Sequence, residues 1–271
     1  MSASPLPPPE KPVTAIEFAA AKAKGRKLAV LTAYDYTTAR LFDAAGVDAL
    51  LVGDSLGMIV QGREHCLRVT LDDVIYHCRC VARAARRALV VADLPFMTYQ
   101  LGPAQALANA GRLVQEGDAH AVKVEGGTRS ADSIRAAVDA GIPVMAHIGL
   151  MPQSVRQVGG FKVQRDSARL LADAKAVQDA GAFAVVVECV PASVAAEVTA
   201  ALTIPTIGIG AGASCDGQVL VGADMLGMFD DVQPKFVKRF GQLGDAIRQA
   251  VADYCRDVRS GTFPAAEHSF R

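Results

Sequence analysis

The 271-residue sequence has no excess of charge of either sign, because 28 Lys and Arg residues balance 28 Asp and Glu residues. A net charge near zero gives no reason to expect nucleic acid or an anionic membrane surface as a partner. A local basic cluster, RAARR at residues 83–87, lies in a helical pattern and is interpreted as a solvated helix face. About half of the residues are apolar, which is typical of a globular protein that buries a large core.

Paired cysteines, an N-terminal apolar segment and long apolar runs are also missing. Six cysteines without a CxxC spacing favour reduced thiols over a disulfide framework. The start, MSASPLPPPEKP, lacks the apolar segment of a signal peptide, and its prolines predict a disordered or extended arm over residues 1–13. No apolar run reaches membrane-spanning length. We therefore expect a cytoplasmic protein with one domain over residues 14–271.

One pattern recurs along the rest of the chain. Short runs rich in Val, Ile, Leu and Ala end in a polar residue or Gly, and Ala-rich segments of helical character lie between them. There are eight such runs: KLAVLTAYD, DALLVGDS, ALVVADLPF, HAVKVEGG, IPVMAHIGL, FAVVVECVP, IPTIGIGAG and QVLVGADMLG. Apolar strands that alternate with helices predict a parallel sheet covered on both faces. Eight units in a chain of this length favour a closed (β/α)8 TIM barrel over an open sheet. Residues 240–258 predict an additional amphipathic C-terminal helix.

Polar residues end most of these runs, and in a parallel barrel the carboxyl ends of the strands form one mouth where active sites lie. The residues are Asp35, Asp54, Ser55, Asp93, Lys123, Glu125, His147 and Glu188, with the glycine loop at residues 208–212. Several carboxylates in a small apolar space cannot all ionise without a cation. Carboxylates without thiolates suit Mg²⁺ or a similarly hard ion. The sequence therefore predicts that Asp54 holds a metal.

Lys123 and Glu125 are two residues apart, so on a strand they point to the same face, where Lys123 could pair with a substrate carboxylate. The alternative is a buried salt bridge that closes the barrel. For Asp54 and Asp93 the alternative is capping of the following turn. Glu188 follows four apolar residues and could serve as a general base, or it could have only a structural hydrogen-bonding role.

Other positions are open between a structural and a functional interpretation. Asp35 suits a turn as well as catalysis, and His147 is more often an interior histidine than a catalytic one. The glycine loop could hold a phosphate or allow a tight turn. In HCRC, only His77 and Cys80 share a helix face, so core packing is favoured over a metal cluster.

The sequence resembles the ketopantoate hydroxymethyltransferase family in motifs that follow one another from about residue 14 to the C-terminal EHSF. These motifs are TAYDY, LLVGDSLGM, VTLDDVIYH, ADLPFMTY, AVKVEGG, HIGLMPQSV, GGFKVQ, VVVECVP, IPTIGIGAG, CDGQVLVGADMLG and PKFVKRF. Arg68 and Met151 depart from the family pattern, which commonly has proline and threonine at these places.

The resemblance implies a barrel of the phosphoenolpyruvate/pyruvate-binding type and a large homo-oligomer, typically a decamer. It implies transfer of a hydroxymethyl group from 5,10-methylenetetrahydrofolate to 3-methyl-2-oxobutanoate, giving 2-dehydropantoate through a Mg²⁺-stabilised enolate, as the first step of pantothenate synthesis. One Mg²⁺ per subunit is implied. The implied roles are metal ligands (Asp54, Asp93, Glu125), substrate contacts (Asp54, Ser55, Asp93, Lys123) and a proton acceptor (Glu188).

Two other functions are considered. A carbon–carbon lyase or phosphonate mutase of related barrels would also chelate an oxo acid through a metal. The Cys-Gly-His loop of the lyase branch is absent from this sequence. A non-catalytic barrel that senses a 2-oxo acid is disfavoured, because a scaffold has no need of a buried lysine among several carboxylates.

Overall fold

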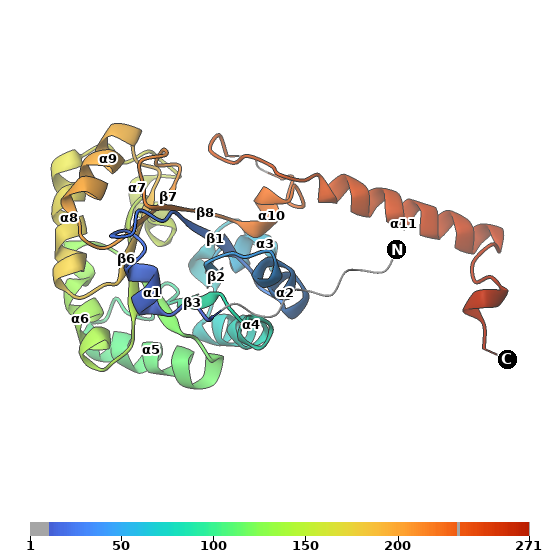
Figure 1. The fold of residues 1–271 in the computed structure, drawn as a ribbon, viewed down its shortest axis with the longest axis horizontal. Coiled ribbons are helices and arrows are strands. Elements are labelled where there is room, and N and C mark those ends of the chain that lie inside the picture. The colour runs from blue at the N-terminus through green and yellow to red at the C-terminus, as the bar shows by residue number, and fades with distance from the viewer. Residues whose placement is uncertain (1–10, 232–233, 271) are drawn as a thin grey trace. The chain divides into compact units, whose positions relative to one another are not determined.

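The computed structural model of the protein describes residues 11–231 and 234–270. Its chain forms two compact units, Met1–Val221 and Gly222–Arg271, which are coloured blue to orange and orange to red in Figure 1. The single domain expected over residues 14–271 stays a prediction. Residues 1–10 of the predicted N-terminal arm lie outside the described residues.

The first unit contains a closed barrel of eight parallel strands, each hydrogen-bonded to the next in sequence, and β8 to β1. The strands are β1 (Leu28–Thr32), β2 (Ala49–Val52), β3 (Leu89–Asp93), β4 (Ala121–Glu125), β5 (Val144–Gly149), β6 (Ala184–Glu188), β7 (Thr206–Ile209) and β8 (Gly217–Leu220). Seven of the eight apolar runs contain one strand each, and β8 begins one residue before the eighth run. The predicted (β/α)8 barrel is confirmed.

Helices connect the strands and lie outside the barrel (Figure 1). Those of the first unit are α1 (Ala15–Ala19), α2 (Tyr36–Ala44), α3 (Leu56–Ile59), α4 (Leu71–Ala84), α5 (Pro103–Gly117), α6 (Ala131–Asp139), α7 (Val155–Val158), α8 (Ser167–Asp179) and α9 (Ala192–Ala201). Short 3-10 turns are η1 (Cys66–Arg68), η2 (Thr128–Ser130) and η3 (Pro152–Ser154). The capping box of Thr70 and Asp73 starts α4, which satisfies two backbone N–H groups that have no partner within the helix.

The second unit contains α10 (Gly222–Met225), α11 (Leu243–Ser260) and the 3-10 turn η4 (Ala266–His268). The helix α11 is the predicted additional C-terminal helix. Its apolar side chains recur at intervals of three and four residues, which places them along one face. They are Leu243, Ile247, Val251, Tyr254 and Val258.

The interior of the barrel is apolar at the amino ends of the strands and polar at the mouth formed by their carboxyl ends. On β3, Leu89 and Val91 belong to the apolar core cluster, and Asp93 follows two residues later. Residues two apart on a strand point to the same face, so Asp93 also points inward. The strands β4, β5 and β6 repeat this order. Their cluster residues Ala121, Met145 and Val186 are followed two positions later by Lys123, His147 and Glu188.

At the amino end of the barrel, α1 contributes Phe18, which is fully buried in the core cluster and packs edge-to-face on Phe183 with ring centroids 5.7 Å apart. Val13, which the predicted arm included, is also buried in this cluster, and its N–H donates to the carbonyl of Arg87 at 2.7 Å. Among the described residues, no helix is long and apolar enough to cross a membrane.

Candidate functional site

Five neighbouring strands, β2 to β6, bring the predicted site residues to one mouth. In the strand register Asp93 lies opposite Lys123, and Glu125 lies opposite His147. Asp54 and Ser55 follow β2 directly after Gly53. A Cβ at position 53 would lie 2.8 Å from Ser55 Oγ, so a residue with a side chain would crowd this turn. The glycine therefore lets the chain place both side chains at the mouth.

The acid cluster, defined as Asp54, Asp93, Lys123, Glu125 and His147, is buried. Lys123 Nζ lies 3.0 Å from Asp93 Oδ1 and 3.8 Å from Glu125 Oε1. The N–H of Asp54 donates to Asp93 Oδ2 at 3.0 Å, which joins the turn after β2 to the end of β3. The buried salt bridge between Lys123 and Glu125, which was the structural alternative for this pair, is therefore present as part of a larger network.

Charge in the acid cluster is unbalanced, because three carboxylates face one ammonium group. Burial raises the pKa of Asp54 and of Glu125, and it raises the pKa of Asp93 to about 6 although Lys123 opposes the shift. For Lys123, burial alone would lower the pKa, but the carboxylates outweigh it and the pKa is raised. Lys123 therefore stays protonated. Its single positive charge cannot balance three carboxylates, so a further cation would stabilise their ionised forms.

His147 lies between two carboxylates from different strands. Its Nδ1 is 3.5 Å from Glu125 Oε1 and its Nε2 is 3.4 Å from Glu188 Oε2. Burial and the positive charge of Lys123 lower the pKa of His147, so its imidazole is neutral near pH 7. The Glu188 side chain is 15% exposed, more than any member of the acid cluster. This places Glu188 where a ligand can reach it.

Ser55 is held by a residue that follows the first strand. The hydroxyl groups of Tyr34 and Ser55 are 2.8 Å apart. Burial raises the pKa of Tyr34, so the phenol keeps its proton. The hydrogen bond between the two hydroxyl groups orients Ser55 at the edge of the acid cluster.

The acid cluster is a candidate site for a hard divalent ion. Among residues 11–231 and 234–270, no three His, Cys, Asp or Glu side chains stand in a ready-made coordination geometry. The chemistry of the donor set nevertheless fits Mg²⁺, because its ligand atoms are carboxylate oxygens and their charge exceeds that of Lys123. Asp54, Asp93 and Glu125 are the residues that would hold the ion.

Gln153 was not singled out from the sequence, although it lies in the quoted motif HIGLMPQSV. Its Nε2 donates to Asp54 Oδ2 at 2.9 Å, and its backbone N–H donates to Glu125 Oε2 at 3.2 Å. Its Oε1 accepts from the Tyr99 hydroxyl at 2.8 Å. A buried glutamine in the turn η3 thus fixes two of the predicted metal ligands.

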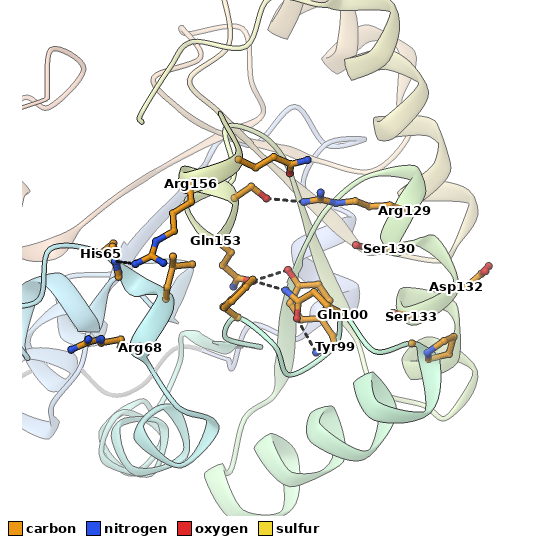
Figure 2. A pocket seen from close by; sticks show the side chains of 16 residues that line it. His65, Arg68, Tyr99, Gln100, Arg129, Ser130, Asp132, Ser133, Gln153 and Arg156 are labelled. Atoms are coloured by element: carbon orange, nitrogen blue, oxygen red, sulfur yellow. Dashed lines mark hydrogen bonds between the residues drawn. The ribbon is translucent and has the colours of Figure 1, made fainter. Parts of the chain in front are cut away.

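A cavity of about 830 Å³ lies on the other side of Gln153 (Figure 2). Its lining comes from the loops that follow β2, β3, β4 and β5. The lining residues are His65, Leu67, Arg68, Phe96, Tyr99, Gln100, Gly102, Pro103, Arg129, Ser130, Asp132, Ser133, Gln153, Ser154, Arg156 and Gln157. Gln153 and Ser130 connect it to the acid cluster, because Ser130 Oγ donates to the carbonyl of Glu125 at 3.0 Å.

The remaining candidates have structural roles. Asp35 is the N-cap of α2, where its carboxylate accepts from the N–H of Thr38 at 2.9 Å. His77 Nδ1 lies 2.6 Å from the carbonyl of Tyr34, and His77 and Cys80 are half-buried. In the glycine loop, Gly210 and Gly212 have positive φ angles of 63° and 82°, which agrees with the tight-turn interpretation.

Solved structures with this fold include 2,3-dimethylmalate lyase of the PEP mutase/isocitrate lyase superfamily (TM-score 0.60, 19% identity, 95% of this chain and 92% of that chain). Phosphonopyruvate hydrolase, solved with oxalate and Mg²⁺, is also similar (TM-score 0.59, 14% identity, 94% of this chain and 93% of that chain). At these identities the similarity shows the fold alone.

Sequence comparison is more specific. Proteins named 3-methyl-2-oxobutanoate hydroxymethyltransferase from Nitratidesulfovibrio vulgaris and Trichlorobacter lovleyi are 59% and 56% identical to this chain. The alignments cover 92% and 96% of this chain, and 83% and 99% of those proteins. The model of the ketopantoate hydroxymethyltransferase family matches residues 12–266. The chain therefore belongs to the ketopantoate hydroxymethyltransferase family.

Proposed function

We propose that the acid cluster and Glu188 transfer a hydroxymethyl group from 5,10-methylenetetrahydrofolate to 3-methyl-2-oxobutanoate, giving 2-dehydropantoate for pantothenate synthesis. The observation that carries the proposal is the buried Lys123 beside Asp93 and Glu125 at the mouth of the barrel. A protonated lysine at the mouth of the barrel can bind the carboxylate of a small keto acid. Family membership supplies the reaction class.

In this proposal Lys123 and Ser55 hold the carboxylate of the keto acid, and Asp54 and Asp93 complete the contacts. Ser55 is positioned by Tyr34, and Lys123 is positioned by two carboxylates. Two fixed contacts prevent rotation of a small substrate, so the hydrogen on its C3 atom keeps one orientation relative to the base.

Asp54, Asp93 and Glu125 would hold Mg²⁺, which when bound supplies Lewis-acid polarisation of the keto acid. The hydrogen bond from Gln153 to Asp54 orients one of these ligands. The interaction of Lys123 with Asp93 orients another.

Glu188 is the proposed proton acceptor. It takes the proton from C3, and the electron pair left on C3 forms a bond to the methylene carbon of the donor. One bond from that carbon to a folate nitrogen breaks in this step, and water then replaces the other nitrogen, so that the hydroxymethyl product and tetrahydrofolate are released. The neutral His147 lies 3.4 Å from Glu188, so it can orient the carboxylate without neutralising its charge.

A carbon–carbon lyase or phosphonate mutase was the alternative function. The lyase and hydrolase neighbours are only 19% and 14% identical to this chain, so they support a common fold and not a common reaction. The relatives at 53–59% identity favour the hydroxymethyltransferase.

The purified protein should form 2-dehydropantoate from 3-methyl-2-oxobutanoate and 5,10-methylenetetrahydrofolate, and a chelator should stop the reaction until Mg²⁺ is restored. Product formation that continues without the folate would contradict the donor. Cleavage of dimethylmalate or phosphonopyruvate would instead support the lyase or mutase alternative.

A homo-oligomer, typically a decamer in this family, is part of the proposal. The apolar face of α11 supports it, because a continuous apolar helix face is stabilised when another surface covers it. Sedimentation of the purified chain tests the assembly, and Val251→Asp should reduce the oligomer to smaller species. A monomer in the unchanged protein would contradict it.

A further inference from the structure

The cavity beside the acid cluster carries an excess of positive charge. Three arginines line it, Arg68, Arg129 and Arg156, whereas its lining contains one carboxylate, that of Asp132. Figure 2 shows Arg129 on one side of Gln153, and Arg68 and Arg156 on the other. The positive groups therefore surround the place where the cavity meets the acid cluster.

None of these three arginines has a carboxylate within ion-pair distance in the described parts of the chain. The guanidinium of Arg129 donates to Ser154 Oγ at 2.9 Å and to Met151 Sδ at 3.4 Å. The guanidinium of Arg156 lies 3.4 Å from His65 Nε2. By contrast, Arg112 on α5 pairs with Asp72 and with Glu116. Within the described residues, no carboxylate therefore balances the charge of these cavity arginines.

The same cavity has an aromatic and apolar wall. Phe96, Tyr99 and Pro103 line it, and the Tyr99 hydroxyl is occupied by Gln153 Oε1 at 2.8 Å. With its hydroxyl held in this way, the Tyr99 ring has a fixed orientation. The Tyr99 ring is itself only 4% exposed, whereas the Phe96 ring is half-buried, so a flat heterocycle can pack against Phe96 while its edge hydrogen-bonds to nearby amides.

The volume of about 830 Å³ far exceeds that of a small keto acid and suits a ligand of drug-like size. A suitable ligand has a flat ring at one end and carboxylates at the other. A tetrahydrofolate has both, since a pteridine ring is joined through aminobenzoate to glutamate. Its reactive ring must lie near the keto acid, which is where Gln153 separates the cavity from Asp54 and Glu125.

We propose that this cavity is the donor site, with the pteridine beside Phe96 and Gln153 and the glutamate carboxylates on Arg68, Arg129 and Arg156. The inference rests on the proposed function for the identity of the donor. Arginine binds carboxylates in a planar, two-point geometry, so the three residues suit a tail with several carboxylates. Affinity should therefore rise with the number of glutamates.

Equilibrium dialysis with tetrahydrofolate triglutamate tests the site directly. Arg68→Gln and Arg156→Gln should each raise Kd about fivefold, as expected for exposed ion pairs, and the double variant about 25-fold. Added salt should weaken binding to the unchanged protein more than to the double variant. The preference for triglutamate over monoglutamate should shrink in the double variant. Arg135→Gln, an exposed position on α6 outside the cavity, should leave Kd unchanged.

A second readout separates the donor from the keto acid. Exchange of the C3 hydrogen of 3-methyl-2-oxobutanoate with D₂O needs no folate, so the arginine variants should keep the unchanged rate. Equal Kd values for all variants, an equal effect of Arg135→Gln, or loss of C3 exchange would overturn the proposed donor site. Folate binding through the arginines without product formation would leave this inference intact and contradict the proposed function instead.

Discussion

Asp93 Oδ1 lies 3.0 Å from Lys123 Nζ, and their side chains are 3% and 5% exposed. These residues come from neighbouring strands and lie opposite each other in the register of β3 and β4. An ion pair this deeply buried loses most of its hydration, and its attraction offsets that cost only while both partners remain. Removal of either residue should therefore destabilise the barrel as well as change the site.

Lys123→Met should lower the free energy of unfolding by about 3 kcal/mol in the presence of a chelator, because it leaves buried carboxylates without their cation. Urea unfolding measures this change. The double variant Lys123→Met/Asp93→Asn should recover part of the loss. A single variant as stable as the unchanged protein would show that the carboxylates are already neutral or hydrated.

Glu188→Gln should reduce exchange of the C3 hydrogen with D₂O by about a hundredfold or more, because an amide cannot accept the proton. The Kd of 3-methyl-2-oxobutanoate should change little, since the substitution preserves size and leaves Lys123 and Ser55 in place. Proton NMR follows the exchange, and Glu197→Gln on α9 is the control. Normal exchange in Glu188→Gln would remove this residue from the role of base.

Mg²⁺ should raise the Tm of the chelated protein, because binding to the native state adds stability of about 2.7 kcal/mol at a hundredfold excess over Kd. Asp93→Asn should abolish most of this shift. Asp35→Asn should retain the Mg²⁺-dependent shift in Tm, because position 35 lies outside the acid cluster and asparagine can also cap α2. An equal shift in both variants, measured at constant ionic strength, would show that Mg²⁺ binds elsewhere.

Gln153→Leu should lower the rate of C3 exchange about tenfold or more, because Asp54 loses the donor that orients it. It should also lower the free energy of unfolding by about 2 kcal/mol, since the hydroxyl of Tyr99 loses its acceptor in a buried place. Gln157→Leu, at an exposed position of the same cavity, is the matched control. A change in stability with a normal exchange rate would limit Gln153 to a structural role.

Acid should destabilise the barrel partly through His120. The N–H of Val90 donates to His120 Nδ1 at 3.1 Å, which requires the unprotonated ring, and burial lowers the pKa of His120 below 6.5. As the pH falls below about 6.5, the unfolded chain takes up this proton first, so the free energy of unfolding decreases.

His120→Asn keeps an acceptor for Val90 but does not titrate in this range. Its free energy of unfolding should therefore fall less between about pH 7 and pH 5 than that of the unchanged protein. Urea unfolding at several pH values measures the difference. Parallel curves for the two proteins would exclude His120 from the acid response.

The sequence by itself predicted the barrel and the residues at its mouth. Eight apolar runs alternate with helical segments, and strand geometry has a period of two, so the position of Asp93 or Lys123 in a run determines its face. Parallel order then brings the carboxyl ends of the strands together. The fold could be predicted because it follows from the local pattern of apolar runs, and the family could be predicted because its motifs are read directly from residue identity.

Only the tertiary structure decided which groups touch. Gln153 lies 99 residues from Asp54 in the sequence, and the three cavity arginines belong to separate loops. The sequence left Asp35 open between a turn and catalysis, and the structure shows that β1 ends at Thr32 and that the Asp35 carboxylate caps α2. Loop contacts of this kind depend on side-chain packing between distant segments, and no periodicity in the sequence encodes their distance or direction.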